Sequence, residues 1–230
     1  MSAISPRVAL SAALLCFAAV ASGAPAQVLD PGYGPLQYKP PAAGSYQLPP
    51  LGVAVDGKVL NDLGERLTLY DLFDDKLVLL GFIYTHCSDI NGCPLASFVM
   101  KKVQGRLAED TGLAQQVRLI SLSFDPAQDT PAALVDYARH FRRPGSDWQF
   151  LTTASETELQ PILDGYGQWR QREYDSDGEL TGSMSHILRV FLIDRQHRIR
   201  NIYSSGFLDA DTVVNDLRTL DIESRAETGS

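Results

Sequence analysis

Two cysteines and the residues around them carry the clearest chemistry in this sequence. Cys87 and Cys93 are separated by five residues in the segment 84–94, Tyr-Thr-His-Cys-Ser-Asp-Ile-Asn-Gly-Cys-Pro. Thiolates attack disulfides and ligate soft metals, so the pair either exchanges electrons with other thiols or holds a metal ion. Because Cys93 precedes Pro94, it is expected at or next to a helix N-cap, where the helix dipole lowers the pKa of a thiol.

A histidine is the expected third member of the site, and the chain has four. His140 lies in an amphipathic helix among arginines and His197 lies in a hairpin turn, so both are expected at the surface. His86 is next to the first cysteine, and strand alternation sends its ring the other way. His186 is favoured because it begins a strand predicted over 187–193, and in a thioredoxin-like sheet that strand start faces the cysteine loop. A histidine satisfied in the core is the alternative for His186.

Two thiolates and one imidazole form a trigonal donor set that suits Cu(I), and an added water or other oxygen lets the set serve Cu(II). Zinc normally requires a fourth closed ligand. Met184 is a further soft donor close in sequence to His186, although methionine more often packs in a core.

The pattern of elements around the cysteines predicts one α/β domain. Residues 76–84 are apolar on both faces and predict a central strand, and residues 94–111 have helical spacing. The other expected elements are hairpin turns at Asp56-Gly57 and Gly64-Glu65, a strand over 117–124, a helix capped by Thr130 and Pro131, a strand over 148–151, a helix with a capping box of Ser155 and Glu158, a hairpin of 187–194 with 198–204, and a helix over 209–220. Together they predict a thioredoxin-like fold, with a central mixed β-sheet flanked by helices and an N-terminal β-hairpin extension.

The segments outside this domain have their own signatures. Residues 1–26 combine one positive charge, a short apolar run and small residues before Ala26, which predicts a cleavable signal peptide and removal of Cys16 with it. Residues 27–50 are proline-rich and predict an extended arm that lies along the domain or tethers it. Residues 51–220 form the expected domain, and residues 221–230 form a polar tail that is expected to fray.

Charge and export limit the partners. The formal net charge is −8, which disfavours nucleic acid. The apolar run of the signal is shorter than the roughly 20 residues of a spanning helix. The expectation is therefore a periplasmic or otherwise exported protein with no membrane span after cleavage, and a membrane-anchored one if the signal is not cleaved.

The cysteine segment resembles a signature of the Sco/SenC family, the copper-binding, thioredoxin-fold proteins that serve cytochrome c oxidase assembly. The family loop reads Y-T-H-C-P-D-x-C-P and is similar to residues 84–94. Here Ser88 replaces the proline, and the pair Asn91-Gly92 is inserted between the cysteines.

Two further family signatures follow in the same order along the chain. V-S-x-D-P-x-x-D-T-P is similar to residues 121–131, with one extra residue before the aspartate. D-H-S-x-x-x-Y-L-I-D resembles residues 185–194, with Ser185 in place of the acid and Ile187 in place of the serine. Three ordered motifs are specific, and the resemblance covers roughly residues 51–220.

The resemblance implies a copper chaperone that uses Cys87, Cys93 and His186 as copper ligands. Its partners would be an apo-metalloenzyme that receives copper, such as an oxidase subunit, and a thiol reductant protein that keeps the cysteines reduced. The longer cysteine loop of this chain distinguishes it from the family, which spaces its cysteines by three residues.

Other interpretations of the two cysteines remain open at this stage. A thiol–disulfide oxidoreductase or redox sensor would cycle Cys87 and Cys93, although such enzymes usually carry C-x-x-C. An inert structural disulfide is common in exported proteins, and a scaffold subunit with a vestigial site is a third alternative. A peroxiredoxin-type peroxidase is disfavoured, because neither cysteine has the P-x-x-x-T-x-x-C spacing.

Overall fold

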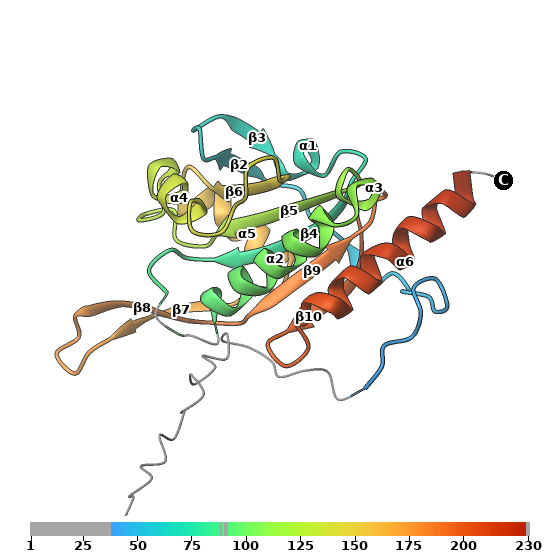
Figure 1. Cartoon of the computed structure of the whole chain (residues 1–230). Helices are drawn as coiled ribbons and strands as arrows, with labels where there is room; N and C mark the ends of the chain where they lie inside the picture. The colour runs from blue at the N-terminus through green and yellow to red at the C-terminus, as the bar shows by residue number, and fades with distance from the viewer. Residues whose placement is uncertain (1–37, 88, 90–91, 229–230) are drawn as a thin grey trace, which may run out of the picture.

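The computed structural model describes residues 38–87, 89 and 92–228 as a mixed sheet with helices on both faces (Figure 1). The elements follow in the order β1 (Gly52–Val53), β2 (Lys58–Asn61), β3 (Arg66–Thr68), α1 (Leu69–Phe73), β4 (Leu77–Ile83), α2 (Cys93–Ala108), α3 (Thr111–Ala114), β5 (Val117–Ser123), α4 (Pro131–Ala138), β6 (Trp148–Thr152), α5 (Glu156–Gly165), β7 (Arg170–Tyr174), β8 (Leu180–His186), β9 (Arg189–Ile193), β10 (Arg198–Ser204) and α6 (Ala210–Thr228). The predicted α/β class and thioredoxin-like fold are confirmed.

The main sheet has the strand order β1-β10-β9-β4-β5-β6-β2-β3. Its centre is β4, which runs parallel to β5 and antiparallel to β9. All seven residues of β4 are buried, as expected for a strand that is apolar on both faces. The strand therefore delivers its carboxyl end, and the cysteine segment that follows, to a fixed point on the edge of the core.

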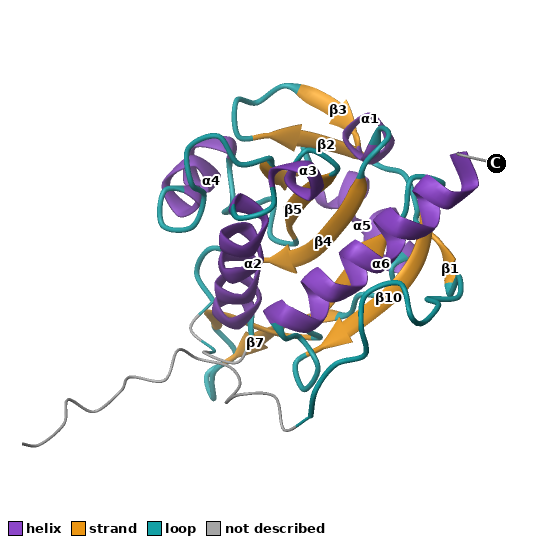
Figure 2. Ribbon diagram, turned by 45° about the vertical axis from the view of Figure 1, so that its right-hand side comes forward, coloured by secondary structure: helices purple, strands orange, loops and turns teal. Residues whose placement is uncertain are grey.

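Helices cover the two faces of the sheet. Figure 2 shows α2 and α6 in front of the central strands and α5 behind them. Helix α2 buries one side, which includes Leu95, Val99 and Val103, as its helical spacing predicts. Because α2 is packed along its length, its first residue, Cys93, is held in place at the end of β4.

A second, two-stranded sheet stands apart from the main one. Strands β7 and β8 pair antiparallel, and Figure 1 shows this hairpin projecting from the body of the domain. No prediction from sequence covered it. The hairpin ends at His186, and β9 begins at Arg189, so the chain passes directly from the projecting hairpin into the central sheet.

The N-terminal hairpin is only partly as predicted. Strands β2 and β3 form it around Gly64-Glu65, in agreement with the sequence. The prediction of a second hairpin turn at Asp56-Gly57 is wrong, because β1 does not pair with β2. Strand β1 pairs instead with β10 at the opposite edge of the sheet. Asp56 instead accepts hydrogen bonds from the backbone N–H groups of Gly57 and Tyr70, which shape a crossing segment.

Two helix ends also differ from expectation. The side chain of Ser155 caps α5, but the Glu158 carboxylate accepts from the backbone N–H of Ala154, so the reciprocal capping box does not form. The tail expected to fray from residue 221 continues α6 to Thr228. Asp221 explains the continuation, because it is buried and pairs with Arg195 and Arg225.

The described part of the proline-rich arm, residues 38–50, lies along α6. The Tyr46 hydroxyl donates to Asp216, and the backbone N–H of Gly44 donates to the Thr219 hydroxyl. The predicted signal peptide and the first part of the arm lie outside the described residues. Within residues 38–87, 89 and 92–228, no helix is both long and apolar enough to cross a membrane.

Candidate metal centre

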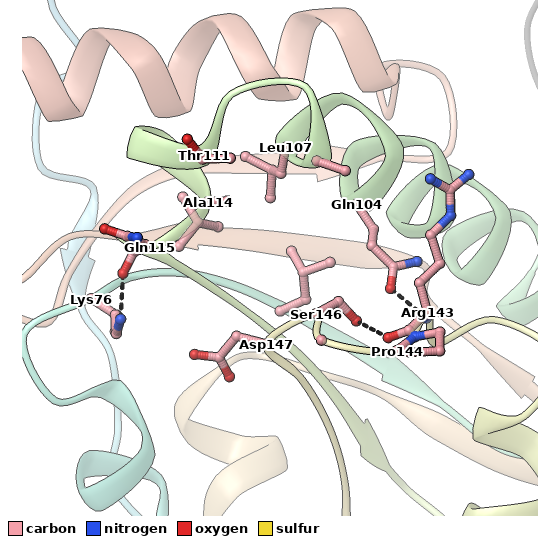
Figure 3. Close-up of a pocket in the computed structure, with 14 residues that line it drawn as sticks. Lys76, Gln104, Leu107, Thr111, Ala114, Gln115, Arg143, Pro144, Ser146 and Asp147 are labelled. Carbon is pink, nitrogen blue, oxygen red and sulfur yellow. Dashed lines mark hydrogen bonds between the residues drawn. The ribbon is translucent and has the colours of Figure 1, made fainter.

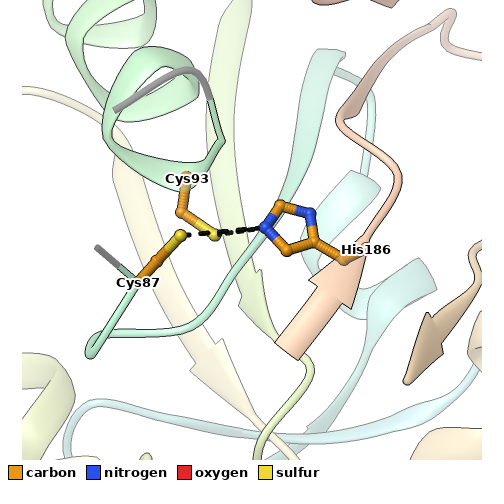
Figure 4. A group of neighbouring side chains, drawn as sticks. All are labelled: Cys87, Cys93 and His186. Atoms are coloured by element: carbon orange, nitrogen blue, oxygen red, sulfur yellow. Dashed lines mark hydrogen bonds between the residues drawn. The ribbon is translucent and has the colours of Figure 1, made fainter. Parts of the chain in front are cut away.

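Three side chains from distant parts of the chain meet at the end of β4 (Figure 4). Cys87 lies in the loop after β4, Cys93 is the first residue of α2, and His186 is the last residue of β8. The ligand atoms of these three residues all lie within 4.8 Å of one another. Both cysteines are free thiols in this structure. The structure thus brings together the three residues that the sequence predicted to share a site.

The spacing of the donor atoms fits a small soft ion. Nε2 of His186 lies 3.7 Å from the Cys87 sulfur and 3.6 Å from the Cys93 sulfur. Bonds of about 2.3 Å to sulfur and 2.0 Å to nitrogen would place S and N about 3.7 Å apart in a trigonal site and about 3.5 Å apart in a tetrahedral one. The observed separations lie between these values, so an ion fits without a large movement of the ring.

Cys93 is the buried member of the pair. Its side chain is 1% exposed, and its sulfur accepts a hydrogen bond from the backbone N–H of Tyr84 at 3.3 Å. Burial, followed by the interaction with Cys87, raises the pKa of the Cys93 thiol well above its usual range. The predicted position next to the N-cap is confirmed, but the lowered pKa predicted for Cys93 is wrong, because desolvation outweighs the helix dipole.

Cys87 is the more accessible and more acidic thiol. Its pKa is lowered to about 4, chiefly by the hydrogen bond with Cys93; partial burial opposes the shift and the hydrogen bond with His186 adds to it. The two opposite shifts favour the thiolate on Cys87 and the protonated thiol on Cys93. A thiolate that faces an imidazole is a ready ligand for a soft cation and a ready nucleophile.

The His186 ring is held by aromatic contacts. The ring centroids of Phe124 and Tyr84 lie 5.0 Å and 5.8 Å from it. Tyr84 also holds the backbone just before His186, since the Tyr84 hydroxyl accepts a hydrogen bond from the backbone N–H of Met184 at 3.3 Å. Among the described residues, Nδ1 of His186 is buried without a hydrogen-bond partner. Packing rather than a hydrogen bond at Nδ1 thus points Nε2 toward the sulfurs.

Gly92 lets the cysteine loop pass beside the imidazole. A Cβ atom at this position would lie 3.1 Å from Nε2 of His186 and 3.2 Å from the carbonyl oxygen of Asp89. Both separations are tighter than ordinary contacts. The inserted glycine therefore leaves space at the one nitrogen that faces both sulfurs.

The other candidate residues lie outside the group. His86 is turned away, as predicted, with Nδ1 3.0 Å from the Thr85 hydroxyl. His140 is exposed, as predicted, whereas His197 is not a free surface residue, because its ring packs 4.2 Å from that of Tyr70. Met184 is buried in the hydrophobic core, the more common role for methionine.

The expected place of His186 needs one correction. It does not begin the strand that crosses the central sheet; it ends β8, opposite Arg170 in the hairpin, and β9 begins only at Arg189. The aromatic contacts of His186 also went unrecognised, although Tyr84 and Phe124 stand in the first and second motifs of the sequence. Aromatic residues at strand ends are common, so their presence alone did not mark them as part of a site.

Of two pockets in the described residues, the smaller one lies beside the cysteines and the histidine. A cavity of about 330 Å³ opens beside the site and is lined by Tyr84, Asp89, Trp169, Glu173, Ser183, Met184, Ser185 and His186. A larger pocket of about 430 Å³ lies between α2, α3 and the loop before β6 (Figure 3). The larger pocket contains neither cysteine nor histidine and sits at the far end of α2, so size does not mark the reactive site.

The fold and this group of donors define a thioredoxin-like protein with a dithiol–imidazole site. The family profile of SCO1/SenC matches residues 58–220, and the chain belongs to that family. The SCO1 protein homolog of Bacillus subtilis (strain 168) is 32% identical over 100 residues, which cover 44% of this chain and 49% of the relative. This chain therefore matches about half the length of that relative.

Solved structures share the fold. A copper-bound ScoI from Arabidopsis thaliana is 21% identical to this chain with a TM-score of 0.63. The superposition covers 74% of this chain and 99% of the Arabidopsis chain. BsSco, described as a Sco-family cytochrome c oxidase assembly protein with a disulfide switch, has 24% identity and a TM-score of 0.59, and covers 76% of this chain and 96% of its own. Likeness at these identities establishes the common fold.

Proposed function

We propose that this protein binds copper through Cys87, Cys93 and His186 and delivers it to a metalloenzyme. One observation carries the proposal: two sulfurs and an imidazole nitrogen, from three separate segments, lie within 4.8 Å of one another. The soft sulfur donors select Cu(I). Among the described residues, no carboxylate oxygen, which would favour a harder ion, joins the group. The copper bound to the Arabidopsis relative is consistent with this assignment.

Transfer would proceed by ligand exchange with the recipient. The three ligands differ in what they contribute, since Cys87 presents an accessible thiolate, Cys93 supplies the second sulfur from inside the core, and His186 closes the set from β8. Binding Cu(I) releases the proton that remains on Cys93, so affinity rises with pH. A disulfide between the cysteines removes both sulfur donors, so a thiol reductant protein is a required partner.

The recipient is a metalloenzyme such as cytochrome c oxidase, the enzyme whose assembly the Sco family of BsSco serves. We place the protein in the periplasm, directed there by the signal at residues 1–26, with membrane anchoring if the signal is retained. Sequencing the N-terminus of the protein recovered from cells tests this: a start after Ala26 supports cleavage, and an intact Met1 supports anchoring.

A thiol–disulfide oxidoreductase is the second candidate, and a specific feature favours it. Cys87 is half-buried, and its thiol has a pKa of about 4. Cys93 lies beside it and is only 1% exposed. An accessible thiolate next to a buried thiol is the arrangement of a nucleophile and a resolving cysteine. Reduction of insulin at a rate matching a dedicated oxidoreductase would favour this function over copper delivery.

The decisive experiment is an anaerobic titration of the reduced protein with Cu(I), with thiols counted before and after. We expect one copper per chain and protection of both thiols from modification. No copper retained against a weak chelator, with both thiols free and reduced, would reject the proposed function.

A further inference from the structure

The turn that follows β5 contacts both halves of the site without contributing a ligand. It contains Asp125 and Asp129, which belong to the second sequence motif. The turn is rigid, because the backbone N–H groups of Gln128 and Asp129 both donate to the carbonyl of Asp125. The two side chains are almost completely buried, at 2% and 0% exposure. Buried carboxylates need partners, and those partners lead to the cysteines and to the histidine.

Asp129 holds the cysteine segment. One carboxylate oxygen accepts from the Thr85 hydroxyl at 2.6 Å, and the other accepts from the Thr85 backbone N–H at 3.1 Å. Thr85 lies two residues before Cys87 and directly after Tyr84. The position at which the chain leaves β4 toward the first sulfur is therefore fixed by a carboxylate from the turn after a different strand.

Asp125 holds the histidine hairpin. Its carboxylate lies 3.0 Å from Nη2 of Arg172 on β7, and the carbonyl of the neighbouring Phe124 accepts from Arg170. In the hairpin, Arg172 is paired with Met184 and Arg170 with His186. The two arginines thus dock the strand partner of the His186 segment onto the turn.

A single hydroxyl links the two aspartates. Oγ of Ser123 donates to the Asp129 carboxylate at 2.5 Å and accepts from the backbone N–H of Asp125 at 2.9 Å. The turn therefore connects two contacts that lead to the sulfurs on one side and to the imidazole on the other.

We propose that Asp125 and Asp129 are positioning residues that set the distance between the two halves of the site, Asp129 through Thr85 and Asp125 through Arg172. The inference rests on the proposed copper site and gives a role to the one motif that supplies no ligand. Outer-shell hydrogen bonds of this kind orient ligands and change metal affinity by about 10–100-fold when removed.

The test uses variants on the partner side, since replacing a buried aspartate could unfold the domain. Thr85→Val removes the hydroxyl, Thr85→Ser retains it, and Arg172→Gln removes the charge that faces Asp125. The matched control is Asp136→Asn, which breaks a pair with Arg139 whose side chains are both 72% exposed. We expect Thr85→Val and Arg172→Gln to lower Cu(I) affinity about 10–100-fold in competition with a chelator. Thr85→Ser and Asp136→Asn should keep the wild-type affinity.

A second background separates positioning from general loss of structure. In His186→Ala protein, Arg172→Gln should cause no further loss of copper affinity, because its effect acts through His186, whereas Thr85→Val should keep its effect. Equal losses for Arg172→Gln with and without His186, or wild-type affinity for both variants, would overturn the proposal.

Hydrogen exchange on the copper-free protein tests the same placement without the metal. Arg172→Gln should speed exchange of the β8 amides, and Thr85→Val that of the segment around Cys87, with the rest of the sheet unchanged. Unchanged or uniformly faster exchange would count against positioning. A wild-type protein that binds no copper would instead reject the proposed function, while these exchange patterns would still decide the role of the turn.

Discussion

The sulfur of Cys87 lies 3.7 Å from Nε2 of His186, although 99 positions of sequence separate the two residues. They also belong to different sheets: the cysteine follows a strand of the eight-stranded sheet, and the histidine ends a strand of the two-stranded one. The site is therefore assembled by tertiary structure, from one sulfur buried in the core and two donors that are partly exposed.

Replacing each donor should affect copper binding to a different degree. Cys87→Ser and Cys93→Ser should abolish stoichiometric Cu(I) binding, because a serine hydroxyl is a poor donor to a soft ion. His186→Ala should leave a dithiol site with strongly reduced affinity. Chelator competition under anaerobic conditions measures all three, with His140→Ala as the exposed control. Full affinity in all three site variants would contradict the assignment.

The two thiols should titrate far apart. The Cys87 pKa of about 4 lies below the ordinary value of 9.0, so its thiolate persists in mildly acidic solution, while burial keeps Cys93 protonated. Iodoacetamide should modify one thiol in mildly acidic to neutral solution, with Cys87 identified by peptide mapping. Equal labelling of both thiols would contradict this asymmetry.

A methyl group at position 92 should disturb the site more than the fold. In Gly92→Ala the new Cβ would lie 3.1 Å from Nε2 of His186 and 3.2 Å from the carbonyl oxygen of Asp89, so the ring or the loop must move by a few tenths of an ångström. Crowding of this kind costs about 1 kcal/mol. Urea denaturation should show a loss of that size, and copper affinity should fall. Gly206→Ala is the control, since a Cβ there meets no atom within 4 Å.

Asp194 should contribute to stability far from the metal centre. Burial would raise the pKa of this carboxyl, but Arg200 and Arg198 lower it overall. Asp194→Asn removes the buried charged partner of Arg200, which is itself 5% exposed and keeps its pair with Glu223, so the change should cost about 1–3 kcal/mol of unfolding free energy. Urea denaturation at neutral pH measures the loss, and copper affinity should be unaffected.

The pH dependence of the Asp194 effect has a defined sign. Because its folded pKa is lowered, the stabilisation is fully present above the unfolded value near 3.8 and is lost as the pH falls through the folded value. The difference between wild type and Asp194→Asn should therefore shrink in strong acid. A difference that stays constant down to the lowest pH at which the protein folds would show that charge is not the cause.

The sequence predicted the cysteine half of the site well, because its signals are local. An apolar run predicts β4, and Pro94 beside Cys93 marks the start of α2. His186 could be selected by its place before a predicted strand and by family resemblance. Its true position at the end of β8 could not, because β7 and β8 are mostly exposed and lack an alternating apolar pattern.

Long-range pairing explains the remaining differences. The turn expected at Asp56-Gly57 has suitable residues, yet β1 pairs with β10 at the far edge of the sheet, which no local pattern specifies. The polar segment after Leu220 continues α6 because Asp221 finds arginine partners, one of them from elsewhere in the fold. The pKa order of the cysteines likewise depends on burial depth, which the spacing of the two residues does not reveal.

The projecting β7–β8 hairpin has a consequence for the proposed release of copper. Its backbone pairing is separate from that of the main sheet. A small rotation of this hairpin would move the imidazole of His186 away while both sulfurs stayed in place. The number of ligands would then fall from three to two. Under the proposed delivery function, an acceptor that contacts the hairpin would thus weaken copper binding while the main sheet stays folded.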